Sequence, residues 1–214
     1  MKQIFADLWE TDVESPFPGL TTHAYLLTRN SGNVLFYNTG HDHERDAIGE
    51  LGGAAWQLLS HQDELGASIL KLRERFGTQL GGHERERDEF ARIRTPDRLF
   101  DRREVLLDNI EVIPTPGHTP GSTCFLVASP TGKRYLFTGD TLYRGDDGTW
   151  KPGYIDGMSD RETLATSLEL LQGLTPDVVI GSAFGGQAGY EEIRPDEWSG
   201  KVESALAQLN GQDA

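Results

Sequence analysis

Three short stretches of the sequence contain side chains that can bind a metal ion or accept a proton. The first is LLSHQDELGAS, in which an apolar run ends at His61 and is followed by Asp63 and Glu64. The second is PTPGHTPGS, which contains His118, and the third is LFTGD, which ends at Asp140. Imidazole and carboxylate groups are ligands that zinc and iron accept. Metal binding is therefore the first chemistry to consider for these stretches.

Each stretch is expected to hold its side chain at the end of a strand. Proline–glycine units lie on both sides of His118, and a stiff loop of this kind can hold a ligand or a base in place. Asp140 follows an apolar strand, where a buried carboxylate is costly unless a cation meets it. Simpler interpretations exist for the acids. Asp140 could cap its own turn, and Asp63 or Glu64 could stabilise the start of a helix.

The elements that must position these residues alternate between strands and helices in two similar halves. In the first half, β-prone apolar runs predict strands at 3–10, 23–28, 33–38 and 54–60, and apolar spacing predicts helices at 42–51 and 64–76. In the second half, the same signals predict two or three short strands within 98–115, strands at 122–129, 133–139 and 177–182, and helices at 159–174 and 195–209. Ser159 and Glu162 fit a capping box at the start of the helix at 159–174, and Pro195 suits the start of the last helix.

This order of elements favours an α/β fold built as a four-layer αββα sandwich. Two half-chains that each end in helices suggest two sheets packed face to face with helices outside. The pattern by itself also allows a doubly wound parallel sheet. The chain has 214 residues and no linker rich in Pro, Gly and Ser, so we expect a single domain over residues 1–214.

Composition restricts the class of partner. The formal net charge is -14, and a strongly acidic surface repels phosphate groups, so we expect neither nucleic acid nor an anionic membrane as a partner. No apolar run approaches the roughly 20 residues that span a bilayer. The stretch MKQIFADLWETD has acids too early for a signal peptide. The single cysteine, Cys124, lies in an apolar run, so we expect a buried, unreactive thiol and a cytoplasmic protein.

Taken in their order, these stretches resemble the motifs of the metallo-β-lactamase fold superfamily of hydrolases. NVLFYNTG looks like the family's opening hairpin, although Asn38 stands where the family commonly has an aspartate. LLSHQDELGAS occupies the place of the His-x-His-x-Asp-His motif. PGHTPGS matches the third-histidine loop, and LFTGDTLY matches the loop of the bridging aspartate. DVVIGSAFGG occupies the place of the last Gly-His, with Ser182 in place of the histidine. The resemblance implies the αββα fold.

The same resemblance implies an incomplete set of metal ligands. Members of the family hold two metal ions, and here the motif's second histidine and the final histidine have no equivalent. His61, His118, Asp140 and Asp63 match ligand positions, and Glu64 aligns with the motif's last histidine. Two histidines with one or two carboxylates are enough for one Zn²⁺ or one Fe²⁺. Asp63 or Glu64 would then take the proton of the attacking water.

Two functions of different class follow from this set. The first is a divergent hydrolase that uses a single metal-activated water on a small-molecule ester, thioester, amide or lactone. The second is a protein without catalysis or bound metal, which uses the remnant cleft to bind a ligand or another protein. His41, His43 and His83 are candidates to replace a missing ligand, although a polar residue at a helix start explains the first two as well. For His23 we expect packing or hydrogen bonding. The substrate and the oligomeric state stay open.

Overall fold

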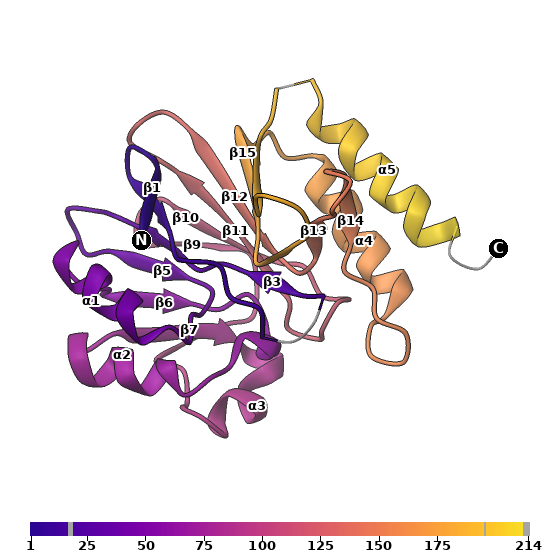
Figure 1. Cartoon of the computed structure of the whole chain (residues 1–214). Coiled ribbons are helices and arrows are strands. Elements are labelled where there is room, and N and C mark those ends of the chain that lie inside the picture. The colour runs from indigo at the N-terminus through magenta and orange to yellow at the C-terminus, as the bar shows by residue number, and fades with distance from the viewer. Residues whose placement is uncertain (17–18, 195, 212–214) are drawn as a thin grey trace. The chain divides into compact units, whose positions relative to one another are not determined.

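The computed structural model describes residues 1–16, 19–194 and 196–211. The chain divides into two compact units, Met1–Asp101 and Arg102–Ala214, and each contains its own β-sheet and helices (Figure 1). The expectation of a single domain over residues 1–214 stays a prediction. Within the described residues, no helix is long and apolar enough to cross a membrane.

The first unit is built on a seven-stranded mixed sheet with the strand order β1-β2-β4-β5-β6-β7-β8. Its strands are β1 Lys2–Phe5, β2 Leu8–Glu10, β4 Tyr25–Leu27, β5 Val34–Phe36, β6 Trp56–Leu58, β7 Gln79–His83 and β8 Arg98–Phe100. The pairs from β1 to β5 are antiparallel, whereas β5, β6, β7 and β8 run parallel to one another. The residues that follow β5, β6 and β7 therefore lie at the same edge of the sheet. A further short strand, β3 (Thr21–Thr22), forms a bridge from Thr22 to Glu14.

Helices connect the parallel strands. The helical segments are α1 Asp42–Glu50, α2 Ser68–Phe76, α3 Arg87–Ala91 and the short 3₁₀ turns Gln62–Glu64 and Glu84–Glu86. Helices α1 and α2 are predicted from apolar spacing, whereas α3 is not. Helix α2 buries Ile69 and Leu72, one turn apart, and Ile69 packs in a cluster with Leu80 of β7. Gly77 ends α2 with a φ of 70°, a left-handed conformation that glycine adopts without strain.

The start of α2 differs from the sequence prediction. The helix predicted at 64–76 begins at Ser68, and Gln62–Glu64 forms a separate 3₁₀ turn. The physical reason is that the Glu64 carboxylate turns back to accept hydrogen bonds from the backbone N–H and the hydroxyl of Ser60. Helix propensity by itself does not predict such a hydrogen bond from a side chain to a nearby backbone group, which competes with helix formation.

The second unit contains a six-stranded sheet with the order β17-β15-β12-β11-β10-β9. Its strands are β9 Glu104–Leu106, β10 Ile110–Pro114, β11 Thr123–Ala128, β12 Arg134–Gly139, β15 Val178–Gly181 and β17 Tyr190–Glu192. Among the described strand pairs of this six-stranded sheet, only β12–β15 is parallel. Three shorter strands of this unit, β13 Leu142–Arg144, β14 Trp150–Pro152 and β16 Ala183–Phe184, pair through β13. The antiparallel pairs in both units rule out a doubly wound parallel sheet.

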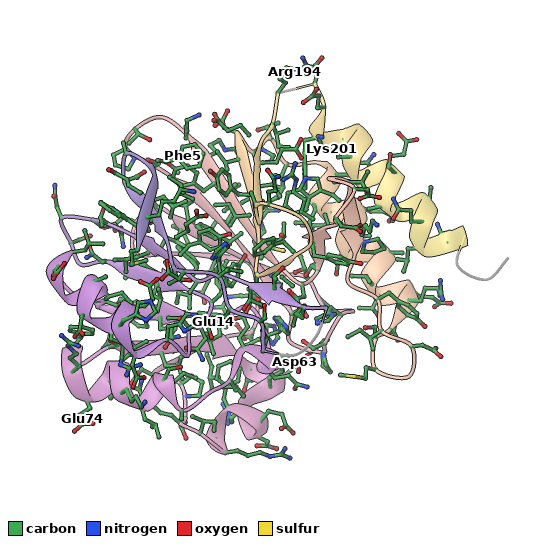
Figure 2. All side chains as sticks on the ribbon, viewed as in Figure 1. Phe5, Glu14, Asp63, Glu74, Arg194 and Lys201 are labelled. Carbon is green, nitrogen blue, oxygen red and sulfur yellow. The ribbon has the colours of Figure 1, made fainter. Side chains whose placement is uncertain are left out.

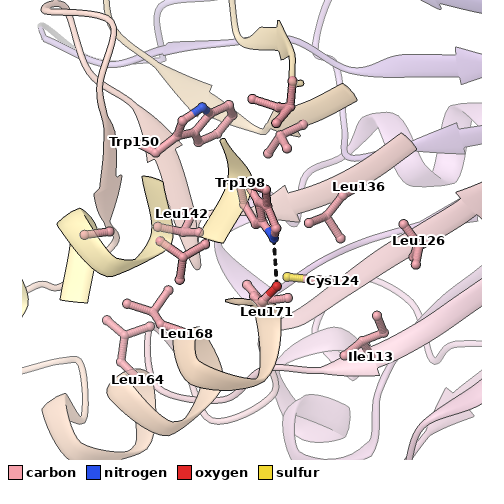
Figure 3. Close-up of a cluster of buried hydrophobic side chains, with 14 of the residues drawn as sticks. Ile113, Cys124, Leu126, Leu136, Leu142, Trp150, Leu164, Leu168, Leu171 and Trp198 are labelled. Atoms are coloured by element: carbon pink, nitrogen blue, oxygen red, sulfur yellow. Dashed lines mark hydrogen bonds between the residues drawn. The ribbon is translucent and has the colours of Figure 1, made fainter. Parts of the chain in front are cut away.

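Two helices that lie side by side cover one face of this second sheet: α4 (Arg161–Gln172) and α5 (Trp198–Gly211) (Figure 1). Helix α4 contributes Leu164, Leu168 and Leu171 to the apolar cluster drawn in Figure 3, as its spacing predicts. The Trp198 indole N–H donates to the carbonyl oxygen of Leu171 at 2.8 Å, which ties α5 to α4. The same cluster encloses Cys124 of β11.

The capping box predicted for α4 is wrong. Asp160, and not Ser159, is the N-cap residue, and its carboxylate accepts the backbone N–H of Thr163 at 2.8 Å. The hydroxyl of Ser159 instead donates to the carbonyl oxygen of His118 at 3.0 Å. The Ser159 side chain therefore bonds to the His118 loop and not, as the capping-box motif predicts, to the first turn of the helix. The predicted start of the last helix at Pro195 lies outside the described residues.

Candidate functional site

His61 follows strand β6 in the first unit and is almost completely buried, with 2% of its surface exposed. Its Nδ1 atom lies 2.8 Å from the hydroxyl oxygen of Ser60. That hydroxyl has a single proton and donates it to the carboxylate of Glu64, which can only accept. The Ser60 oxygen must therefore accept from His61, so Nδ1 carries the imidazole proton. The lone pair of the neutral ring is then on Nε2.

The two acids after His61 have different surroundings. Asp63, labelled in Figure 2, has a side chain that is 42% exposed, and its Oδ2 atom lies 4.0 Å from His61 Nε2. The Glu64 side chain is 8% exposed and accepts hydrogen bonds from the backbone N–H and the hydroxyl of Ser60. Asp63 is thus beside the lone-pair nitrogen of His61, whereas Glu64 is on the opposite, Nδ1 side of the ring. The proposed role of either acid as a proton acceptor stays a prediction.

Asn38 supports this turn from the end of the neighbouring strand β5. Its side-chain amide donates to the carbonyl oxygen of Glu64 at 2.9 Å. Its side-chain oxygen accepts from the hydroxyl of Ser68 at 2.7 Å and from the amide of Gln57 at 3.1 Å. The position at which the resemblance has an aspartate therefore carries a neutral amide that both donates and accepts. An aspartate could not make the bond to Glu64.

His118 lies in the second unit, in the loop between β10 and β11, and 3% of its surface is exposed. Its Nδ1 atom is 2.6 Å from the carbonyl oxygen of Gly153. Because a carbonyl oxygen only accepts, Nδ1 is again the protonated nitrogen, and Nε2 carries the lone pair. Nε2 lies 3.9 Å from the Oδ2 atom of Asp140.

Close backbone packing explains the glycines around His118. A Cβ atom on Gly117 would lie 2.4 Å from the Cα of Leu164 in α4, and its φ of +135° is strained for any other residue. A Cβ on Gly153 would lie 1.6 Å from the carbonyl oxygen of Asp140 and 3.3 Å from His118 Nδ1. These glycines therefore let two backbone segments approach closely enough to hold the His118 ring.

Asp140 follows strand β12, as predicted, and its side chain is 21% exposed. Its Oδ1 atom accepts hydrogen bonds from the hydroxyl of Ser182 and, at 3.2 Å, from the backbone N–H of Ala183. Ser182 stands where the resemblance has the final histidine. The hydroxyl thus occupies one oxygen of Asp140, and the other oxygen is the one nearer to His118.

Three further histidines have roles of their own within the first unit. His83 Nδ1 accepts the backbone N–H of Arg85 at 3.1 Å, so its lone pair is already used, and burial lowers the pKa of the imidazole. His41 takes the N-cap position of α1, and its Nε2 lies 3.2 Å from the carbonyl oxygen of Val13. His23 packs edge-on against Tyr25, with ring centroids 6.1 Å apart, which agrees with the expected packing role.

His43, in the first turn of α1, belongs to a second acidic group. Its Nε2 lies 2.9 Å from Asp12 Oδ2, and the ligand atoms of Asp12, His43 and Glu44 all lie within 4.8 Å of one another. The side chains of Asp12 and His43 are 68% and 61% exposed. The hydrogen bond to His43 is the largest cause of the lowered pKa of Asp12. The His43 imidazole is therefore engaged in a hydrogen bond with Asp12 at the surface.

Cys124 is a buried thiol, as predicted. Its sulfur lies 3.2 Å from the Thr115 hydroxyl, and burial raises the pKa of the thiol to about 12. At neutral pH it is therefore protonated and a poor nucleophile.

The comparisons with known proteins agree with this arrangement. Residues 38–183 match the family model of the metallo-beta-lactamase superfamily, so the chain belongs to that superfamily. It is 30% identical over 209 residues to the hydroxyacylglutathione hydrolase GloC of Haemophilus influenzae, a match that covers 86% of this chain and 93% of that protein. The α/β class and the metallo-β-lactamase type of fold predicted from the sequence are confirmed.

Solved structures show the same fold at lower identity. A metallo-beta-lactamase from Pontibacter korlensis superposes with a TM-score of 0.73 at 18% identity, covering 99% of this chain and 98% of that chain. The di-iron-bound form of TTHA1623 superposes with a TM-score of 0.63 at 24% identity, covering 84% of this chain and 92% of that chain. Together with the curated relative, these findings support a hydrolase with the metallo-β-lactamase fold.

Proposed function

We propose that this protein is a metal-dependent hydrolase that cleaves a small-molecule thioester. The observation that carries the proposal is the shared tautomer of two buried histidines. In His61 and in His118, Nδ1 donates within the protein and Nε2 carries the lone pair. Histidines that bind a metal almost always have their second ring nitrogen engaged in this way.

The proposed ligands are His61 and Asp63 of the first unit and His118 and Asp140 of the second. The superfamily pattern, in which both motifs serve one metal centre, is the reason for assigning the two pairs to the same ion. Two imidazole nitrogens and two carboxylates suit Zn²⁺ or Fe²⁺. The di-iron form of TTHA1623 shows that, in that protein, this fold holds iron. The residues present therefore fit a single metal ion.

In this proposal the chain's own residues would hold the metal ion, and Asp63 has a second task besides its place among the ligands. When bound, the metal ion lowers the pKa of a water molecule and polarises a carbonyl group. Asp63 is partly exposed and near His61 Nε2, so we assign to it the role of accepting the water proton. Water oxygen adds to the thioester carbon, the carbon–sulfur bond breaks, and the leaving thiolate takes up the proton. The products are a carboxylic acid and a thiol.

The thioester class comes from the relatives. Both the protein from Haemophilus influenzae and a second relative from Rhizobium meliloti, 30% identical over 143 residues, are hydroxyacylglutathione hydrolases. A small-molecule substrate also suits the net charge of -14, which disfavours nucleic acid and anionic membranes. A cytoplasmic location is part of the same proposal.

The alternative, a binding protein without metal, has one specific observation in its favour. Without a metal, Asp140 needs another partner, and its Oδ1 does accept from Ser182 and from the backbone of Ala183. Oδ2, however, is the oxygen near His118. Metal content separates the two functions because only the hydrolase requires an ion.

The experiment is elemental analysis of untagged protein, purified without added metal, together with a thioester hydrolysis assay. We expect about one equivalent of zinc or iron in the wild type and its loss in His61→Ala and in His118→Ala. His43→Ala is the matched control and should retain both metal and activity, because His43 contacts Asp12. Absence of metal in the wild type after incubation with zinc, or equal metal in all variants, would overturn the proposal.

A further inference from the structure

Glu64 and Ser182 stand where the superfamily has histidines that bind its second metal ion. In this chain, each of them lies next to a proposed metal ligand. Glu64 aligns with the last histidine of the first motif, and Ser182 with the final histidine. Both side chains make specific hydrogen bonds near the proposed ligands. Glu64 hydrogen-bonds to the serine that contacts His61, and Ser182 hydrogen-bonds to Asp140.

The chain from Glu64 to His61 has only one consistent direction of hydrogen bonding. The buried carboxylate of Glu64 accepts from the Ser60 hydroxyl, and it also accepts the Ser60 backbone N–H at 2.8 Å. A carboxylate whose side chain is 8% exposed needs such donors, because its burial is otherwise costly. The Ser60 hydroxyl, having donated, can only accept from His61 Nδ1. Glu64 therefore sets the tautomer of His61 from the Nδ1 side of the ring, both through Ser60 and through its own Oε1 atom, which lies 3.4 Å from Nδ1.

Ser182 acts on Asp140 in a comparable manner. Its hydroxyl and the adjacent N–H of Ala183 both donate to Oδ1. Two donors on one oxygen hold the plane of the carboxylate and direct Oδ2 to the side of His118, 3.9 Å from its Nε2. A histidine at position 182 would compete for the same oxygen or for a metal.

We infer that Glu64 and Ser182 are positioning residues that convert a dinuclear framework into a mononuclear one. Glu64, through Ser60 and through its own contact with Nδ1, keeps the lone pair of His61 on Nε2, and Ser182 keeps Oδ2 of Asp140 on the side of His118. The value of these contacts for metal binding rests on the proposed function. The hydrogen bonds themselves do not, because Glu64, Ser60 and His61 are joined within the first unit, and Ser182 and Asp140 within the second.

The first test uses metal-free protein, stripped with a chelator and labelled with ¹⁵N. The ring nitrogen shifts of His61, assigned from their absence in His61→Ala, report which nitrogen is protonated. We expect Nδ1–H in the wild type and in Ser60→Thr, which keeps the hydroxyl. In Glu64→Gln we expect Nε2–H to appear, since the glutamine amide can donate to Ser60 and reverse the chain. In Ser60→Ala we expect Nδ1–H to persist, because Glu64 Oε1 lies 3.4 Å from Nδ1. An unchanged tautomer in Glu64→Gln would overturn the role of Glu64.

The second test measures zinc affinity by competition with a chromophoric chelator. Ser60→Ala, Glu64→Gln and Ser182→Ala should each weaken binding by about 10- to 100-fold, as loss of a ligand's hydrogen-bond partner typically does. Ser60→Thr should bind like the wild type. Ser129→Ala removes a buried hydroxyl bonded to Thr131 and serves as the matched control without effect. Wild-type affinity in the three variants would contradict the inference.

The two tests separate the two ideas. Failure of the wild type to bind zinc or iron would remove the proposed function, while the metal-free spectrum would still decide the direction of the Glu64–Ser60–His61 chain. Zinc binding with an unaltered tautomer in Glu64→Gln would keep the proposed function and remove the inference for Glu64.

Discussion

The Nδ1 atom of His118 lies 2.6 Å from the carbonyl oxygen of Gly153, a residue 35 positions later in the chain. This contact holds the ring in one orientation and places the lone pair on Nε2. It depends on the close approach of Gly153 to the backbone of Asp140, since a Cβ atom there would lie 1.6 Å from the Asp140 carbonyl oxygen. Gly153 thus links the backbones that carry two of the proposed ligands.

The first prediction concerns this approach. Gly153→Ala forces the backbone apart, so we expect a loss of about 1–3 kcal/mol in the free energy of unfolding, together with loss of bound metal. Urea denaturation and elemental analysis measure the two effects. Gly200→Ala is the matched control: nothing lies within 4 Å of its added Cβ in helix α5, and stability should rise by up to about 1 kcal/mol. Equal stability of Gly153→Ala and the wild type would show that the close approach is not required.

The second prediction tests how much one histidine can restore. Ser182→His returns the final histidine of the superfamily pattern, but the first motif still lacks a histidine at position 64. We expect metal content to stay at about one equivalent, and affinity to fall because Asp140 loses the Ser182 hydroxyl. Titration with zinc followed by elemental analysis gives the stoichiometry. Two tightly bound equivalents would mean that position 182 alone determines the nuclearity.

The third prediction distinguishes the two residues before helix α4. Asp160→Ala removes the N-cap that accepts the Thr163 N–H, so the thermal midpoint should fall. The pKa of Asp160 is lowered chiefly by that backbone hydrogen bond. Its stabilising effect is therefore present above the unfolded-state pKa and is lost as the pH falls through the folded-state pKa. Thermal melts of Asp160→Ala and wild type should converge in acid, and a constant difference down to that range would contradict the assignment.

The fourth prediction uses the buried thiol. Burial raises the pKa of Cys124 from 9.0 to about 12, so the folded state holds its proton where the unfolded state has lost it. The stabilising contribution is complete below pH 9 and decreases as the pH rises toward the folded-state value, by about 1.4 kcal/mol per pH unit. Urea denaturation between pH 8 and 10.5 should show a shallower decline for Cys124→Ala than for the wild type. Parallel declines would mean that the thiol does not titrate in this range.

Much of the fold could be predicted from local patterns because apolar runs and apolar spacing report which residues are buried. The hairpin of β4 and β5, strand β6 and the spacing of Ile69 and Leu72 in α2 are all visible in the sequence. The loops around His118 and Asp140 are also recognisable, because Gly117 and Gly139 have positive φ angles, a backbone conformation that favours glycine. These features, with their order, were sufficient for the superfamily.

Only the tertiary structure decided what the side chains of that framework contact. The sequence marks Glu64 as an acid near a helix start and Ser159 as a cap, whereas the structure joins Glu64 to Ser60 and Ser159 to His118. In the structure, His83 Nδ1 also accepts a hydrogen bond from the backbone N–H of Arg85. The Ser182 hydroxyl donates to Asp140, 42 residues earlier in the chain. The physical reason is that a hydrogen bond depends on tenths of an ångström between atoms that folding brings together, whereas residue order and apolar spacing determine only which elements form.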